Sequence, residues 1–331
     1  MLSGFAITQV GDAHIARGKG CEDHSTCKHF HSFALGTDVI ISIVADGVGT
    51  CPLASVGSSV ATESLATFLE RALQSAAFFA ILKSLAQNAD EVVLKLIRHA
   101  FSYSIGKVEE RACSDGNPPE WYDTTLTCTV FDGTNAWWGH AGDDGVVALT
   151  KSGEFRMVTH RHEGSDACSV VPLRERSSWE FGAEHDVASL ALMTDGMLDY
   201  CVSSAALGNL VDVRFLQPLL YSIIESTTDL DETHDSWNEL LWGSLETTKA
   251  YGFRVRDRVR DDLTLVLASS SSAVQSLPAF DVSLIDKYHN ELHEKSQELQ
   301  AALRMTANAR FAEMARAGRA IESNQRSSQN E

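Results

Sequence analysis

The stretch that most constrains the fold is residues 38–50, DVIISIVADGVGT, where a run of apolar and β-branched residues ends in Asp46-Gly47. Val and Ile fit a pleated, packed surface, so the run predicts a buried strand, and the glycines after it permit a tight turn. A carboxylate at the end of a rigid strand is well placed to bind a metal ion or to act as an acid. Asp-Gly is also an ordinary turn sequence, so a functional interpretation requires that the pattern recurs.

The pattern does recur along the chain. One strand-like run leads into Gly142-Asp143, another ends in Thr194-Asp195-Gly196, and Asp261-Asp262 precedes an apolar run at 263–268. Glu22-Asp23 lies in an early, loop-rich connection. Carboxylates brought together repel one another unless cations neutralise them, and oxygen ligands favour Mg²⁺ or Mn²⁺ over zinc. The pattern therefore indicates a two-metal hydrolase.

Composition limits the partners and the compartment. The formal net charge of -18 and the pI near 5.0 argue against binding to nucleic acid or to an anionic membrane surface, because both reward clustered Lys and Arg. The seven cysteines form no C-x-x-C pair, which favours a reduced protein, and the first residues do not read as a secretory signal. We therefore expect a cytoplasmic protein with no nucleic-acid and no membrane partner.

The first half of the chain predicts strands followed by helices. Residues 3–10 and 33–45 alternate or are apolar, and we expect them to form a first hairpin or strand pair joined by a loop-rich connection. Apolar residues at helical spacing predict a helix at 54–73 and a second helical region at 76–112, broken near Asn88.

The second half returns to strands. Residues 124–155 predict a meander of antiparallel strands, followed by an irregular connection and a strand ending at Asp195. Helical segments are expected near 204–226 and 235–250, before the strand at 263–268.

The C-terminal part differs in kind from the rest. The domain prediction is a catalytic domain at 1–268, a Ser-rich linker at 269–280, and a tail at 281–331 with a disordered end. Near-heptad apolar positions predict an amphipathic helix up to about Met314: Ile285, Tyr288, Leu292, Leu299 and Leu303. Self-association or binding of a partner is favoured for this helix over packing on its own domain.

Taken in order, the motifs resemble a known family. They are Glu22-Asp23, Asp46-Gly47-Val48-Gly49, Thr124-Thr125-Leu126, Gly142-Asp143, Thr194-Asp195-Gly196 with Asp199, and Asp261-Asp262-x-Thr264. This set resembles the metal-dependent type 2C serine/threonine protein phosphatases in their bacterial form, over about residues 5–268. The resemblance implies an α+β fold, a four-layer α/β/β/α sandwich of two antiparallel sheets flanked by helices.

The resemblance also implies a set of catalytic residues. Asp46 would bridge two Mn²⁺ or Mg²⁺ ions, with the carbonyl of Gly47 on the second, and Asp195 and Asp261 would bind the first. The implied reaction is attack of a metal-bridging water on phosphoserine or phosphothreonine, without a phosphoenzyme.

Three further ligands are implied around that core. Glu22 and Asp23 would act mainly through metal-bound waters, and Asp143, with Asp195, would contribute to a third ion seen in bacterial members. The implied partners are a phosphorylated protein substrate and a cognate Ser/Thr kinase.

The chain departs from the family pattern at the phosphate-binding position. Many members carry an arginine four residues before the Glu of the first motif, where this chain has Gly18. Arg17, Lys19 or His14 could substitute, and the sequence does not choose among them.

Other departures surround the metal motifs. Thr50 replaces a usual glycine, and Asp144-Gly145 stands where Ser-Arg is common. Val48 occupies the place of a histidine proposed as general acid in eukaryotic members, which leaves protonation of the leaving group unassigned. No implied carboxylate ligand is lost, so we expect an active enzyme; the alternatives are a regulatory or binding module with little turnover, and a hydrolase of a small phosphate ester.

Overall fold

Two antiparallel five-stranded sheets form the centre of the molecule. The computed structural model describes residues 1–84, 88–160, 170–222 and 261–327. The first sheet contains, in spatial order, β1 (Leu2–Gln9), β10 (Leu263–Ser270), β9 (Val187–Met193), β6 (Gly145–Thr150) and β7 (Phe155–Met157). The second contains β2 (His24–Ser32), β3 (Thr37–Ala45), β4 (Leu126–Phe131), β5 (Ala136–Ala141) and β8 (Glu180–Glu184).

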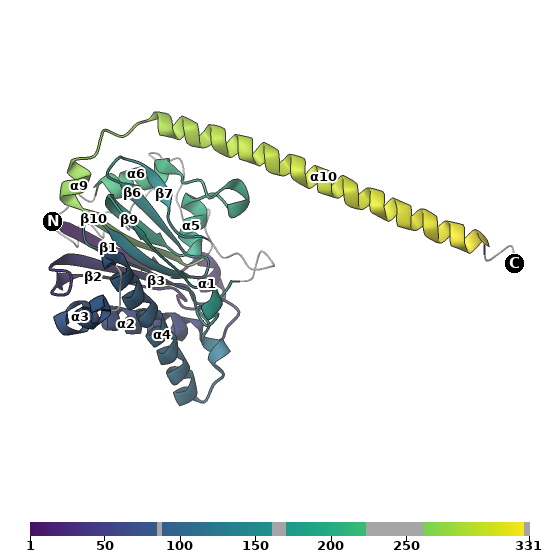
Figure 1. Ribbon diagram of the computed structural model, residues 1–331. Helices are drawn as coiled ribbons and strands as arrows, with labels where there is room; N and C mark the ends of the chain where they lie inside the picture. The colour runs from purple at the N-terminus through teal and green to yellow at the C-terminus, as the bar shows by residue number, and fades with distance from the viewer. Residues whose placement is uncertain (85–87, 161–169, 223–260, 328–331) are drawn as a thin grey trace.

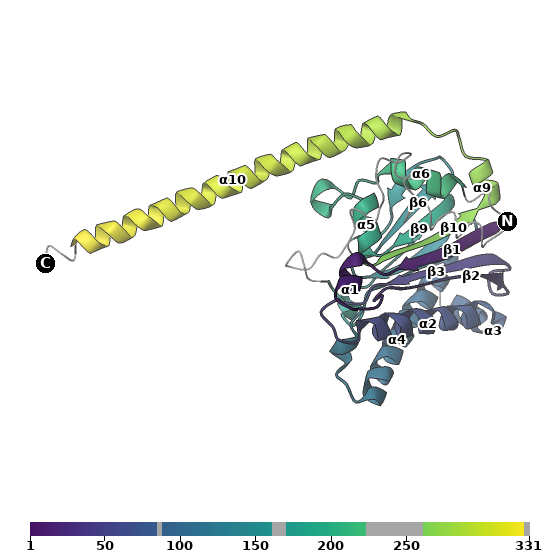
Figure 2. The ribbon, with the colours of Figure 1, turned by 180° about the vertical axis from the view of Figure 1, so that it is seen from behind.

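Helices cover the outer face of each sheet (Figures 1 and 2). The second sheet is covered by α2 (Ala54–Leu73), α3 (Ala76–Ser84) and α4 (Ala89–Asp115), and the first by α5 (Asp195–Cys201) and α6 (Val213–Ser222). The short elements are α1 (Asp12–Ala16), η1 (Pro119–Tyr122), η2 (Arg176–Ser178), η3 (Ala205–Leu207) and α9 (Ser271–Gln275). The predicted α/β/β/α sandwich is confirmed.

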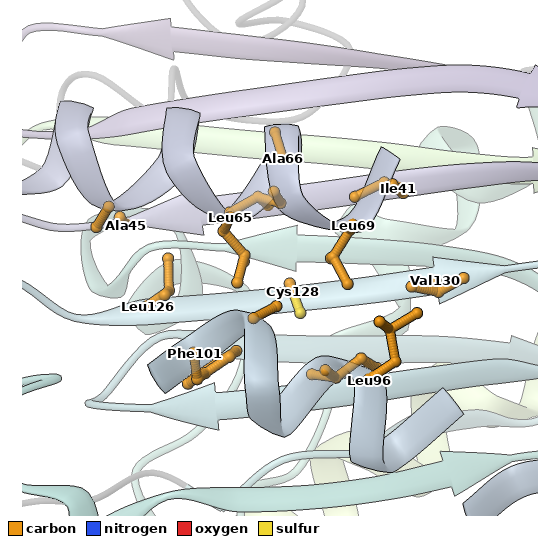
Figure 3. Close-up of a cluster of buried hydrophobic side chains, with 14 of the residues drawn as sticks. Ile41, Ala45, Leu65, Ala66, Leu69, Leu96, Phe101, Leu126, Cys128 and Val130 are labelled. Carbon is orange, nitrogen blue, oxygen red and sulfur yellow. The ribbon is translucent and has the colours of Figure 1, made fainter. Parts of the chain in front are cut away.

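Alternation along the strands divides the apolar side chains among three layers. Leu126, Cys128 and Val130 of β4 face α2 and α4, where they meet Leu65 and Leu96 (Figure 3). A separate cluster fills the space between the two sheets, and a third lies beneath α5 and α6. Each fully buried large aliphatic or aromatic side chain contributes about 1.5–3 kcal/mol, so these layers hold the strand ends rigidly.

The expected pairing of residues 3–10 with 33–45 is wrong. The strand β1 pairs with β10 of the first sheet, whereas β3 pairs with β2 of the second. The strand β2 lies within the segment that the sequence predicts to be loop-rich. The polar sequence of this strand, HSTCKHFHS, is the reason for that wrong prediction. Its residues are mostly half-buried at the edge of the sheet, where polar side chains are tolerated.

The predicted meander at 124–155 is correct only in part. The strands β4 and β5 are paired neighbours, and so are β6 and β7, but β5 and β6 belong to different sheets. The chain crosses between the sheets at Gly142, which has φ of +127°. A Cβ there would lie 2.5 Å from the Thr125 side chain, so the crossing requires glycine.

The helical predictions agree closely with α2 to α4. The helix α2 spans 54–73 as expected, and Asn88 caps α4 by accepting a hydrogen bond from the Glu91 N–H at 2.8 Å. The helix expected at 235–250 lies outside the described residues, and only part of the one at 204–226 is described, as η3 and α6.

The C-terminal helix is longer than expected. The helix α10 (Ser283–Ser327) continues past Met314, and its first turns contact η3 and α6 before it leaves the body of the domain (Figures 1 and 2). Part of the Ser-rich segment is folded, since α9 lies at 271–275 with Val274 buried. The last residues, 328–331, lie outside the described part of the chain.

Candidate metal centre

The acidic motifs meet at one end of the sandwich, and Asp46 stands at its centre. The Asp46 backbone is held by two threonines. Its N–H donates to Thr125 Oγ1 at 2.7 Å, and its carbonyl accepts from Thr125 N at 2.8 Å and from Thr124 Oγ1 at 2.7 Å. The Thr124-Thr125 motif therefore fixes the backbone that presents the Asp46 carboxylate.

Gly47 is packed too closely to carry a side chain. A Cβ at this position would lie 2.8 Å from Ala54 at the start of α2. The Gly47 N–H donates to the Glu22 carbonyl at 3.1 Å, which ties the turn to the first acidic motif. Glycine is needed here for close approach rather than for an unusual backbone conformation.

Asp23 links three of the motifs. Its Oδ2 accepts hydrogen bonds from the hydroxyls of Thr194 and Thr264, both at 2.7 Å, and the residue is 2% exposed. These threonines stand next to Asp195 and close to Asp261 in the chain. Asp23 thereby holds the start of β2, the end of β9 and the start of β10 in register.

The two adjacent acids before β10 have different surroundings. The Asp262 carboxylate is buried and accepts from the backbone N–H groups of Gly11 and Glu22, both at 2.6 Å. The Asp261 side chain is 57% exposed at the rim of the site, 3.6 Å from His14 Nε2. Only Asp261 is therefore free to meet an ion, and Asp262 holds the early loop.

Two further acids complete the predicted set. Asp195 is the first residue of α5, directly after β9, and Asp143 lies at the crossing between β5 and β6. Both are partly buried. The structure thus brings the predicted ligands to the same end of both sheets: Glu22, Asp23, Asp46, Gly47, Asp143, Asp195 and Asp261.

Mutual repulsion shapes the electrostatics of this cluster. Burial, and then the neighbouring Asp143 and Asp261, raise the pKa of Asp195 to about 8. Burial raises the pKa of Asp23 to about 7 although its two threonine hydrogen bonds act in the opposite direction. The pKa of Asp46 is raised well above its ordinary value by burial and by the charges of Asp23 and Asp195. A divalent cation would relieve this repulsion.

The donor set fits a hard divalent cation. All of the candidate side chains are carboxylates, and Glu22 Oε2 is buried without a hydrogen-bond partner in the described part of the chain. No group of three or more His, Cys, Asp or Glu side chains in the described ranges is arranged to hold an ion by itself. The carboxylates would therefore have to draw together around an ion, or share it with the Gly47 carbonyl and water.

The three phosphate-binding candidates are placed differently. His14 is buried, with Nδ1 2.9 Å from Asp262 Oδ2 and Nε2 3.5 Å from Glu22 Oε2. Arg17 is exposed at the end of α1. Lys19 Nζ donates to Glu22 Oε1 at 2.9 Å and to the Gly49 carbonyl at 3.0 Å, at the edge of the carboxylate cluster.

Sequence reasoning missed two residues of the site. The sequence motifs assign no role of their own to Asp262, and they mark Asp144 only as a departure from the family pattern. Asp144 is fully buried beside the cluster. The pairs Asp143-Asp144 and Asp261-Asp262 each stand just before a strand. Side chains alternate between the two faces of a strand, and this alternation predicts that one acid of each pair points inward.

A four-layer α/β/β/α sandwich with a cluster of carboxylates at one end is typical of metal-dependent hydrolases. A model of the protein phosphatase 2C family matches residues 10–235, which is more than half of the chain. The chain therefore belongs to the protein phosphatase 2C family of metal-dependent serine/threonine protein phosphatases.

Solved structures agree with this assignment at the level of the fold. A bacterial serine phosphatase is similar over 81% of this chain and 98% of its own, at 13% identity and a TM-score of 0.51. Serine/threonine phosphatase Stp1 from Staphylococcus aureus is similar over 81% of this chain and 95% of its own, at 15% identity and a TM-score of 0.50. A search of curated proteins found no significant match. None of the described helices is long and apolar enough to cross a membrane.

Proposed function

We propose that this chain is a Mn²⁺- or Mg²⁺-dependent phosphatase that hydrolyses phosphoserine and phosphothreonine in proteins. The observation that carries the proposal is the tie made by Asp23 to Thr194 and Thr264, which gathers the acidic motifs around Asp46. A cluster of hard oxygen ligands on rigid strand ends is the arrangement that metal-assisted phosphoryl transfer requires.

In this proposal each acid has a role toward the ions. Asp46 would hold two ions together with the Gly47 carbonyl, Asp195 and Asp261. When bound, the ions would lower the pKa of an attacking water and neutralise charge on the phosphoryl group. Glu22 and Asp23 would act through water molecules around the ions, and Asp143, with Asp195, would contribute to a third ion.

Lys19 is the best-placed phosphate anchor among the three candidates. His14 is enclosed by Glu22, Asp261 and Asp262, so its ring supports the early loop. Arg17 is exposed at the C-terminal end of α1. The Lys19 ammonium lies between Glu22 and the Gly49 carbonyl, where it can meet a phosphate bound to the ions.

The anchor can be tested by comparing Lys19→Ala with Lys19→Arg. Removal of the amine should lower kcat/KM for a phosphopeptide by about tenfold or more, since a charge-assisted hydrogen bond contributes about 1.5–3 kcal/mol. Arginine should restore most of the loss, and Arg17→Ala should leave the rate near wild type. A normal rate for Lys19→Ala with a reduced one for Arg17→Ala would assign the role to Arg17.

The enzyme assignment is tested by hydrolysis of p-nitrophenyl phosphate with Mn²⁺ supplied. Asp46→Asn and Asp195→Asn should abolish the activity, whereas Asp38→Asn, an exposed acid at the far end of β3, should retain it. Wild type as inactive as Asp46→Asn would favour the alternative of a regulatory module. Comparison of phosphopeptides with free phosphorylated metabolites distinguishes a protein substrate from a small phosphate ester.

Two parts of the proposal concern the setting of the enzyme. A cognate Ser/Thr kinase is the expected source of the phosphorylated substrate. A cytoplasmic location stays a prediction from cysteine usage, and the six described cysteines are free thiols.

The tail helix is the proposed site of self-association. The first turns of the helix pack on the domain, with Tyr288 beside Arg214 of α6. The apolar stripe beyond them is incompletely covered, since Leu292 and Leu299 are half-buried and Leu303 is 60% exposed. Residues 281–303 contain five acidic and two basic residues, a net of -3, whereas 304–326 contain two acidic and five basic, a net of +3. An antiparallel pair of tails would place each acidic half beside a basic half, so we infer that the partner is a second copy of this chain.

Charge reversal tests both the association and its direction. Glu294→Lys with Glu298→Lys, or Arg316→Glu with Arg319→Glu, should each reduce the molar mass measured by light scattering from dimer toward monomer. The four substitutions combined should restore the dimer, because the two halves are then exchanged. A monomeric wild type would refute self-association, and dimers unaffected by either pair of substitutions would refute the antiparallel direction.

A further inference from the structure

Asp144 is a buried carboxylate at a position where serine is common in the protein phosphatase 2C family. It lies in the crossing between β5 and β6, next to Asp143, and is 0% exposed. Its Oδ2 accepts a hydrogen bond from Thr127 Oγ1 at 3.3 Å. Its Oδ1 makes no hydrogen bond of normal geometry in the described part of the chain, although the Thr125 side chain lies near enough to the carboxyl group to act against the rise in its pKa. A buried carboxylate oxygen without a partner requires an explanation.

The surroundings of Asp144 are those of the cation site. Burial and the charge of Asp143, followed by those of Asp23 and Asp195, raise the pKa of Asp144 well above its ordinary value. Asp144 in turn contributes to the raised pKa of Asp46. The carboxylate therefore adds to the same concentration of negative charge, and within the described ranges it forms no ion pair with a basic residue.

Asp144 is held by a set of hydrogen bonds that involves Thr127 and His140. Thr127 and His140 are directly opposite each other on β4 and β5, and Thr127 Oγ1 lies 2.8 Å from His140 Nδ1. The buried His140 ring donates through Nε2 to the His160 carbonyl at 2.8 Å, since a carbonyl can only accept. The single hydroxyl proton of Thr127 is therefore shared between His140 Nδ1 and Asp144 Oδ2. These hydrogen bonds reach Asp144 through its Oδ2 and leave Oδ1 available to another partner.

We propose that Asp144 supplies an additional carboxylate ligand to the divalent-cation centre and that Thr127 and His140 position it. The inference rests on the proposed function, because it requires that the neighbouring acids bind Mn²⁺ or Mg²⁺. An added carboxylate suits these cations, which take oxygen ligands and bind more tightly as ligand charge increases. His140 and Thr127 correspond to the outer partners that orient metal ligands in other sites.

The test is Mn²⁺ binding to the full-length, metal-stripped protein, measured by calorimetry and by the bound Mn²⁺ retained after gel filtration. Asp144→Asn should weaken binding by about 100-fold or more or reduce the number of ions by one, since the loss of an outer partner alone weakens metal binding by about 10- to 100-fold. Thr127→Val and His140→Gln should weaken binding less than Asp144→Asn does. Asp38→Asn, distant from the site, should bind as wild type.

Melting temperature provides the second measurement. Without metal, Asp144→Asn should melt at or above the wild-type temperature, because one acid is removed from a cluster of acids that repel one another, and Mn²⁺ should raise its melting temperature by less than in wild type. Unchanged affinity and stoichiometry, with a lower metal-free melting temperature, would make Asp144 a structural residue and overturn the inference. A wild-type protein that binds no Mn²⁺ would instead overturn the proposed function.

Discussion

Substitution of Asp262 tests whether the two adjacent acids before β10, Asp261 and Asp262, have different roles. Asp262→Ala removes the acceptors for two buried backbone donors, Gly11 N and Glu22 N, both at 2.6 Å. It also removes the carboxylate oxygen that lies 2.9 Å from His14 Nδ1. The early loop that carries Glu22 would lose its tie to β10.

The expected magnitude follows from these contacts. Each hydrogen bond to a charged acceptor contributes about 1.5–3 kcal/mol, so the loss of both should destabilise the metal-free protein by about 3–6 kcal/mol. Asp262→Asn keeps one oxygen acceptor and should lose about half of that amount. Asp261→Ala removes a largely exposed side chain and should change the stability by no more than about 0.5 kcal/mol.

Urea unfolding in the presence of EDTA measures these changes, with circular dichroism as the signal. The chelator is required so that altered metal binding does not contribute to the apparent stability. A loss of less than about 1 kcal/mol for Asp262→Ala would refute the proposed tie, since one hydrogen bond to a charged group alone contributes more than that. An equal loss for Asp261→Ala would refute the assignment of different roles.

Two further predictions use other parts of the site and its support. Gly57→Ala should destabilise the protein by about 1–3 kcal/mol or more, because the new Cβ would lie 2.0 Å from the Tyr122 carbonyl oxygen. Gly106→Ala, with open space around it in α4, should instead stabilise the protein by about 0.5–1 kcal/mol. Urea unfolding of both variants measures these changes. In EDTA, the free energy of unfolding should fall as the pH rises from about 5 to about 8. The reason is that the pKa values of Asp23 and Asp195 are raised to about 7 and about 8, so both carboxyl groups bind protons more tightly in the folded than in the unfolded protein. Saturating Mn²⁺ should remove this slope, and a stability that rises over the same range without metal would contradict it.

Local sequence signals predicted the elements that carry their own pattern. The apolar run before Asp46 is β3, the helical spacing at 54–73 is α2, and the break near Asn88 is the capped start of α4. These predictions succeeded because propensity, period and capping all favoured the same structure. The polar edge strand β2 was missed because nothing in its local pattern separates it from a loop.

The sequence by itself determined the fold class, the family and the set of acids that could bind a metal, because these depend on residue types and on their order along the chain. Only the tertiary structure decided what each acid contacts. It assigned Asp262 to the early loop and Asp261 to the rim, and it buried Asp144 beside Asp46. The physical reason is that adjacent carboxylates are chemically identical in sequence, and only the backbone donors, hydroxyls and charges brought to them by distant segments make their roles differ.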